Sequence, residues 1–170
     1  SAIRLSWVRW FSSADSSASR SCVVRNWAIP QAFCEGVFPG VGVGIGAMLH
    51  AGVAAWAAAF AVAEHKGAKG PDVLAAVVAG YETTIRIGLS VQPGHFKRGF
   101  QSTGTCVGFG TAVAAGRLLF RGPDAAQKIA DTLGLAGGYA SGLAQFYYSG
   151  GSAKRIHAAH AAEGGVSAAL

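Results

Sequence analysis

The chain has 170 residues and carries little charge for a free-standing soluble domain. Charged residues make up 13% of it and hydrophobic residues 51%, whereas about a quarter of an ordinary domain is charged. This length predicts one domain with a real core. The shortage of charge favours part of a larger assembly, an obligate oligomer or a membrane protein. The net charge is +6, but the basic residues are scattered and do not alternate with aromatics, which argues against nucleic-acid binding.

Cysteine usage argues against a structural metal. Cys22, Cys34 and Cys106 form no CxxC pair and no metal-ligand spacing with histidine. Such a sparse, odd number fits a reducing cytosol, so we expect a cytoplasmic protein, with Cys106 as a small buried helix residue. GVGVGIGA (Gly40 to Ala47) matches a dinucleotide fingerprint. No clear strand precedes it, and we expect no cofactor.

Residues 1–46 differ in composition from the rest. They are rich in Ser, Arg and Trp and then in Gly, without a sustained helical or strand period, and we assign them no fold. The apolar run from Val37 to Ala63 is long enough to span a bilayer. His50 in its middle and its many glycines argue against a span. We therefore predict no membrane association and keep a small helical membrane protein as an alternative.

From residue 51 onward the pattern is helical, and no hairpin signal appears. Glycines and prolines mark the breaks, with Pro71 and Asp72 suited to a helix start. Either Thr103 or Thr105 could cap the third helix. The predicted helices cover 51–65, 71–91, about 103–120, 124–133, a Gly-rich stretch to 148, and a last helix after Gly150-Gly151. The fold class is all-α, an Ala/Gly-rich helical bundle over residues 47–170.

The second predicted helix carries an apolar stripe. Its members recur every fourth residue, which places them on one face. The stripe consists of Val73, Val77, Tyr81 and Ile85, widened by Leu74 and Val78.

Two polar segments interrupt this apolar chain and are the candidate places for chemistry. One is KRGFQSTGTC from Lys97 to Cys106, and the other is SAKRIHAAH from Ser152 to His160. We expect the glycines of the following helix to serve helix contact and not phosphate binding. We expect His65 and His95, which sit beside breaks in the pattern, to be exposed.

Several stretches in order resemble the MmgE/PrpD family. They are HAGVAAWAAAFAVAEHKGAKGPDVLAAVVAGYETTIRIG from His50, HFKRGFQSTGTCVGFGTAVAAGRLL from His95, DTLGLAGGYASGLAQF from Asp131 and SAKRIHAAHAAEGGVSAAL from Ser152. The family includes 2-methylcitrate dehydratase, cis-aconitate decarboxylase and an iminodisuccinate epimerase. The resemblance implies a dimeric, metal-independent lyase or isomerase with a large helical domain followed by a lid. We expect the lid to be absent from this chain.

The resemblance also implies which residues act. His50 matches the histidine of the family's HPG-type motif, and Lys154 and His157 match its TK-x-LH motif. Two departures stand out: the family's acidic run upstream of the first histidine is missing, and the histidine of its GFHPTGT loop is Gln101 here. An amide cannot take up a proton at neutral pH.

These residues fit proton abstraction next to a carboxylate of a small di- or tricarboxylic acid. Histidine is a base of near-neutral pKa, so His50 or His157 would transfer the proton. Lys154, three residues before His157 on a helix, would hold a carboxylate. Gln101, Thr103 and Thr105 would bind substrate, although plain helix capping is the simpler interpretation of both threonines. The alternative function is a catalytically inactive helical fragment that dimerises or packs against a partner.

Overall fold

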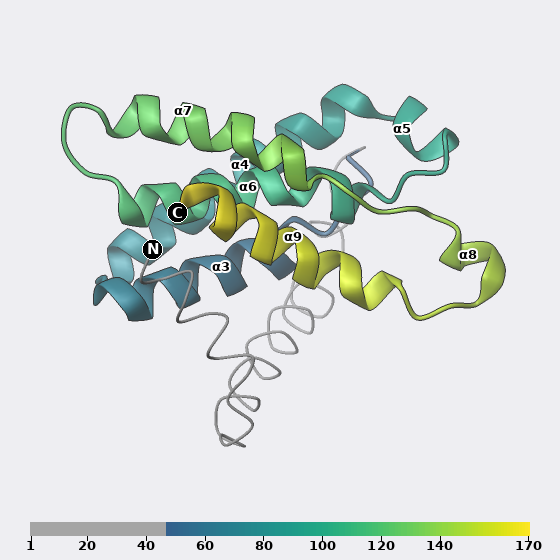
Figure 1. Cartoon of the computed structure of the whole chain (residues 1–170), viewed down its shortest axis with the longest axis horizontal. Coiled ribbons are helices and arrows are strands. Elements are labelled where there is room, and N and C mark those ends of the chain that lie inside the picture. Colours follow the sequence, from purple (N-terminus) through teal and green to yellow (C-terminus); the bar gives the residue numbers. More distant parts are fainter. Residues whose placement is uncertain (1–46) are drawn as a thin grey trace, which may run out of the picture.

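The computed structural model describes residues 47–170, which form a helical bundle (Figure 1). The unassigned segment, the glycine fingerprint up to Gly46 and the first part of the Val37–Ala63 run lie outside the described residues. The long helices are α3 (Ala51–Lys66), α4 (Gly70–Val91), α6 (Ser102–Leu119), α7 (Ala125–Ala136) and α9 (Lys154–Ala169). The short ones are α5 (Gly94–Lys97), η2 (Gly137–Tyr139) and α8 (Phe146–Ser149). The all-α prediction is confirmed for this part of the chain.

Helix α6 is the centre of the bundle. Only Phe109, Arg117 and Leu119 of its 18 residues escape full burial. Helices α3, α4, α7 and α9 all pack against it. A helix surrounded in this way needs small side chains wherever a neighbour comes close, and α6 is mostly Gly, Ala, Thr and Val.

Helices α3, α6 and α9 run in the same direction. One core cluster joins their first halves and includes Ala54, Val107 and Ala161. A second cluster joins their second halves and includes Val62, Leu118 and Val166. Helix α4 runs the opposite way, because its start contributes to the second cluster and its end to the first. The N-termini of three neighbouring helices therefore meet at one end of the molecule.

Glycine is required where α4 crosses α6. A Cβ on Gly110 would overlap the Thr84 hydroxyl and the Gly80 carbonyl, and a Cβ on Gly80 would lie 2.8 Å from the Gly110 carbonyl oxygen. On the other side of α6, the Thr111 hydroxyl donates a hydrogen bond of 2.8 Å to the Ala161 carbonyl of α9. The expectation that α6 glycines serve helix contact is confirmed at Gly110.

The predicted stripe of α4 is only partly buried. Val73 and Val77 are buried, but the side chains meant to widen the stripe, Leu74 and Val78, are 55% and 67% exposed. Each follows a stripe residue directly in sequence, so it points about 100° further around the helix, to the side that α6 does not cover. Among the described helices, α4 is the one long and apolar enough to cross a membrane by length and composition, with a third of its apolar window buried.

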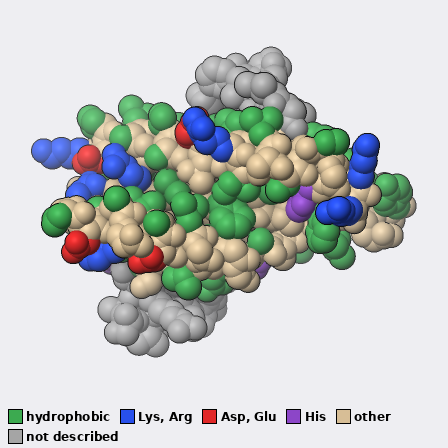
Figure 2. Space-filling view, turned by 90° about the horizontal axis from the view of Figure 1, so that it is seen from above, with side chains coloured by type: hydrophobic (Ala, Val, Ile, Leu, Met, Phe, Trp, Pro, Cys, Tyr) green, Lys and Arg blue, Asp and Glu red, His purple; other side chains and the backbone are tan. Residues whose placement is uncertain are grey.

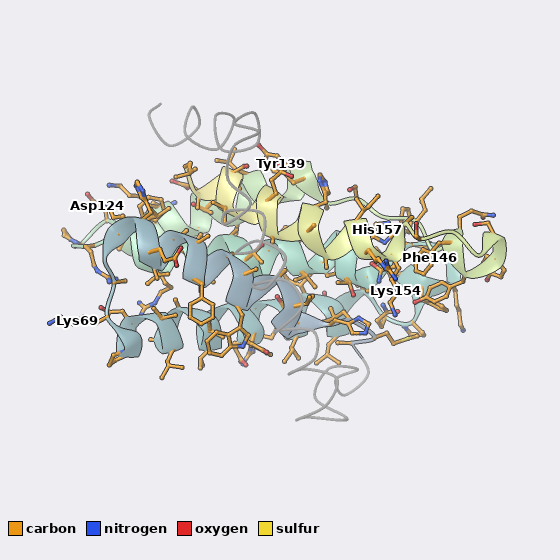
Figure 3. The ribbon with its side chains drawn as sticks, turned by 90° about the horizontal axis from the view of Figure 1, so that it is seen from below. Lys69, Asp124, Tyr139, Phe146, Lys154 and His157 are labelled. Atoms are coloured by element: carbon orange, nitrogen blue, oxygen red, sulfur yellow. The ribbon has the colours of Figure 1, made fainter. Side chains whose placement is uncertain are left out.

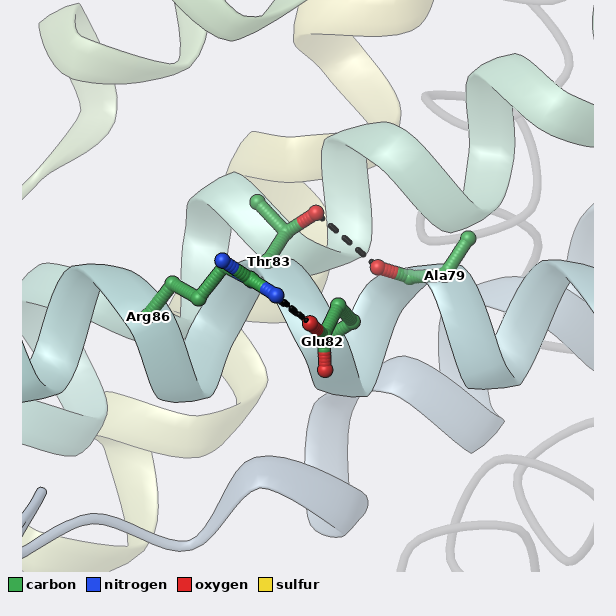
Figure 4. A network of polar contacts seen from close by, with 4 residues as sticks. All are labelled: Ala79, Glu82, Thr83 and Arg86. Carbon is green, nitrogen blue, oxygen red and sulfur yellow. Dashed lines mark hydrogen bonds and ion pairs between the residues drawn. The ribbon is translucent and has the colours of Figure 1, made fainter.

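The exposed side of α4 also carries a small polar network (Figure 4). Arg86 and Glu82 form an ion pair one turn apart, and both side chains are more than half exposed. The Thr83 hydroxyl donates to the Ala79 carbonyl at 2.9 Å. Exposed pairs of this kind contribute only about 0.3–0.5 kcal/mol, so the network is a feature of the helix surface and not a candidate site.

The Gly-rich stretch before Tyr148 is not one continuous helix, contrary to the prediction. Helix α7 ends at Ala136 and η2 at Tyr139. Residues 140–145, which we call the strap, then run beside the start of α6 without helical structure and turn at 144–145 into α8. Gly142 has a φ of 139°, which excludes a helical backbone. Backbone hydrogen bonds from Gln101 to Gly142 (3.0 Å) and from Ala144 to Gly99 (2.8 Å) hold the strap in place. These pairings and the run of glycines outweigh the weak helical pattern.

The central packing predicts opposite effects for two glycines of α6. Gly110→Ala should destabilise the chain by about 1–3 kcal/mol, because the new methyl group overpacks the α4 contact. Gly108→Ala should be neutral or stabilising by up to about 1 kcal/mol, because alanine favours helix and its Cβ would meet only the Ala161 carbonyl oxygen, at 3.6 Å. Urea unfolding followed by circular dichroism measures both. Equal effects would contradict the packing described.

Candidate functional site

Gln101 caps the start of α6. Its side-chain oxygen accepts a hydrogen bond of 2.7 Å from the Gly104 N–H, and its carbonyl oxygen accepts from the Gly104 and Thr105 N–H groups. The prediction that Thr103 or Thr105 caps this helix is therefore wrong. Glutamine is an uncommon cap, which is why the sequence pointed to the threonines. Only 4% of Gln101 is exposed, so its amide is used inside the protein.

His50 is held against the first turn of α6. It precedes α3, and its backbone N–H donates to the Thr103 hydroxyl oxygen at 3.2 Å. Its ring nitrogen Nδ1 lies 3.1 Å from the same oxygen. Thr103 is buried and His50 is half-buried. Thr103 thus lies behind the imidazole and orients it, which is a different role from direct substrate contact.

His157 reaches the same turn of α6 from α9. Its Cβ lies 3.3 Å from the position that a Cβ on Gly104 would take. The Phe146 ring packs edge-on against the imidazole, with 5.6 Å between ring centroids. Burial lowers the pKa of His157 below its ordinary value, and nearby His160 lowers it further. The ring is half-buried and favours its neutral form.

His95 is partly buried and bonded, and was wrongly expected to be exposed. Its Nε2 lies 2.6 Å from the Thr105 hydroxyl oxygen, its ring stacks on Phe100, and burial lowers its pKa. Thr105 and Thr103 are two residues apart, so their side chains point about 200° apart around the helix. Thr105 and His95 therefore lie on another side of α6 from Thr103 and His50.

Lys154 lies next to His157 at the start of α9 (Figure 3). It is the first residue of the helix and is exposed, and His157 follows three residues later. Residues at this spacing are neighbours on a helix surface. The structure thus brings an ammonium group and two imidazoles from two separate segments, the residue before α3 and the start of α9, to the first turn of α6.

The end of the molecule that holds these residues is basic. Helices α3, α6 and α9 start here, and none has an acidic residue in its first turn. Each start carries partial positive charge from its helix dipole. On the face seen in Figure 2, acidic side chains lie toward the other end and the middle, and the charged side chains seen at this end are Lys and Arg, with His beside them. The basic residues of these segments are Lys97, Arg98, Lys154 and Arg155.

The six predicted site residues separate into two layers. His50, Lys154 and His157 reach the surface, whereas Gln101, Thr103 and Thr105 are at most 8% exposed and lie beneath. Sequence reasoning missed Phe146, because an aromatic in an apparent helix signals only a core position. Within the described residues, no group of His, Cys, Asp or Glu is placed to hold a metal ion.

The fold and this site define a helical domain in which two histidines and a lysine lie where three neighbouring helices begin. A family profile described as the MmgE/PrpD N-terminal domain matches residues 45–170. The chain therefore belongs to the MmgE/PrpD family, and the matched part is the N-terminal domain of that family. Searches of curated proteins and of solved structures each found no match.

The cap at Gln101 can be tested against a second glutamine. Gln101→Ala should destabilise the chain by about 0.5–2 kcal/mol, the usual cost of losing a helix cap. Gln145 precedes α8 and makes no side-chain cap bond, so Gln145→Ala should change the stability by less than about 0.5 kcal/mol. Urea unfolding provides the comparison, and a silent Gln101→Ala would show that the cap is dispensable.

Stability should depend on pH through His95 and His157. Both have a folded pKa below the ordinary value of about 6.5, so the unfolded chain takes up protons first. Their contribution is complete above about pH 6.5 and is lost as the pH falls toward the folded values. Urea midpoints measured from about pH 8 to 5 should fall with pH. The fall should be smaller in His95→Gln and His157→Gln, and an unchanged slope in both would contradict this.

Proposed function

We propose that this domain carries part of the active site of a lyase or isomerase that acts on a small di- or tricarboxylic acid. The main support for the proposal is that His50, His157 and Lys154 all lie at the end of the molecule where α3, α6 and α9 begin. Membership of the MmgE/PrpD family supports the reaction class. Dehydration of 2-methylcitrate and decarboxylation of cis-aconitate are the forms to test first.

A polycarboxylate matches the charge of this end. Lys154 supplies a mobile ammonium group, and three helix starts supply fixed partial positive charge behind the histidines. With no acidic side chain in the first turns of these helices, nothing there competes for the ammonium group. Exposed and unpaired in the described structure, Lys154 is available to bind a carboxylate.

The imidazoles of His50 and His157 are the groups that would transfer the proton. A hydrogen on carbon next to a carboxylate becomes acidic only when the resulting negative charge is stabilised. A neutral imidazole can take that proton at pH 7, and Lys154 would stabilise the charge that develops. Gln101, which caps α6, takes no part in proton transfer, and Thr103 orients His50.

The proposal predicts a loss of activity at one lysine and not at another. Lys154→Ala should lower kcat/KM by about ten- to a hundred-fold, the effect of losing one charge-assisted hydrogen bond. Lys69→Ala should stay within about twofold, because Lys69 is also exposed but lies at the other end of the molecule (Figure 3). Turnover of 2-methylcitrate and cis-aconitate by the purified chain, followed by proton NMR, measures both variants.

A folded chain without turnover would contradict the proposal that this chain is active by itself. The second candidate function is then a helical domain that packs against a partner. The buried amide of Gln101 favours it, because that side chain cannot move a proton. Circular dichroism of the same preparation separates an inactive folded chain from an unfolded one.

A further inference from the structure

The two histidines of the site differ in what their inner ring nitrogen meets. Nδ1 of His50 lies 3.1 Å from the Thr103 hydroxyl oxygen. Nδ1 of His157 is fully buried and has no hydrogen-bond partner among the described residues. A hydroxyl can donate to a bare nitrogen or accept from an N–H. The two rings therefore respond differently to a proton.

Among the described residues, no acceptor lies within hydrogen-bond distance of His157 Nδ1. The ring is bordered by Gly104, by Gly142 of the strap, whose Cβ position would lie 3.5 Å from His157 Cδ2, and by the edge-on Phe146. A buried N–H without an acceptor is costly, and native structures tolerate an unpaired lone pair better than an orphaned N–H. Nδ1 therefore stays unprotonated, and the neutral ring carries its proton on Nε2.

The charged groups near His157 oppose an imidazolium form. Lys154 and His160 lie three residues before and after it on α9, and α6, α8 and the strap present no acidic side chain to it. The lowered pKa of His157 agrees with this arrangement. His157 is thus poorly suited to hold an extra proton between two reaction steps.

His50 has the complementary arrangement. The Thr103 hydroxyl donates to Nδ1 when that nitrogen is bare and accepts from it when it carries a proton, while the same oxygen accepts the backbone N–H of His50. The ring can therefore gain or lose a proton at Nε2 with Nδ1 bonded in each state.

We propose that the two histidines have different roles. His50 takes up and returns the proton, and His157 acts as a neutral hydrogen-bond donor through Nε2–H. This inference rests on the proposed function. The His50 Nε2 lone pair takes the proton from the carbon next to a substrate carboxylate, and the C–H electron pair moves into the enolate. The enolate oxygen accepts the His157 Nε2–H bond. His50 Nε2 then returns its proton to the departing group or to carbon.

The direct test is the tautomer of His157 in the intact chain. Long-range proton–nitrogen correlation spectra of uniformly ¹⁵N-labelled protein report which ring nitrogen carries the proton, and the signals missing from His157→Gln assign the residue. At pH 7 we expect a bare Nδ1 and a protonated Nε2. A proton on Nδ1, or an imidazolium ring at pH 7, would overturn the proposal.

A pair of substitutions tests the donor role. Glutamine can place an amide N–H near the position of Nε2, whereas asparagine places it near Nδ1 and leaves the outer position empty. With citrate as the probe, His157→Gln should keep the Kd within about threefold, and His157→Asn should weaken binding at least about tenfold. The reverse order, in variants shown to be folded by circular dichroism, would contradict a donor at Nε2.

The same experiments separate failure of this inference from failure of the proposed function. If the wild-type chain binds citrate but Nδ1 carries the proton, only the division of roles is overturned. If Nδ1 is bare but the wild-type chain does not bind citrate, the proposed function fails and the donor role fails with it.

Discussion

The close packing of α6 against its neighbours determines how the other long helices are arranged. Thr84 and Gly80 of α4 touch it at Gly110, where a Cβ would have no room. On its other side, the Thr111 hydroxyl bonds the α9 backbone. A helix so enclosed needs small residues wherever a neighbouring helix comes close. This explains a core of Ala, Gly, Thr and Val, and the short distances bring side chains from three helices to one turn.

The parallel course of α3, α6 and α9 follows from this packing and places the site. Because the three helices start at the same end, His50, Gln101 and Lys154 come together although they are far apart in sequence. The buried polar side chains at the start of α6 support the outer layer: Gln101 completes the helix start and Thr103 fixes an imidazole. Gln101, which stands where the resemblance implies a histidine, is thus a structural residue in this chain.

Much of the fold could be predicted from the sequence, because periodicity and Gly-Pro breaks report helices directly. The bounds of α3, α4 and α9 agree with the prediction to within a few residues. The strap was missed because its extended shape depends on backbone pairing with Gly99 and Gln101, and local sequence does not encode such distant pairing. The prediction that Leu74 and Val78 widen the buried stripe of α4 was wrong. Periodicity identifies the apolar face of a helix but not how much of that face a neighbouring helix covers.

For the site, the residues were predictable and their relations were not. The motifs pointed to His50, Lys154 and His157, but no spacing in the sequence could show that Thr103 bonds one histidine while the inner nitrogen of the other has no partner. Likewise, His95 looked exposed because its flanking lysine and glycines are typical of a surface turn. Its contact with Thr105 arises only when α5 folds back on α6.

We propose that the shared start of α3, α6 and α9 binds a polycarboxylate. The most direct measurement is a titration of the ¹⁵N-labelled chain with citrate, followed by amide chemical shifts residue by residue. We expect saturable shifts concentrated at residues 49–53, 101–105 and 154–158. Shifts gathered at the opposite end of the molecule, around Lys69 and Asp124, or no saturable shifts in a folded chain, would contradict it.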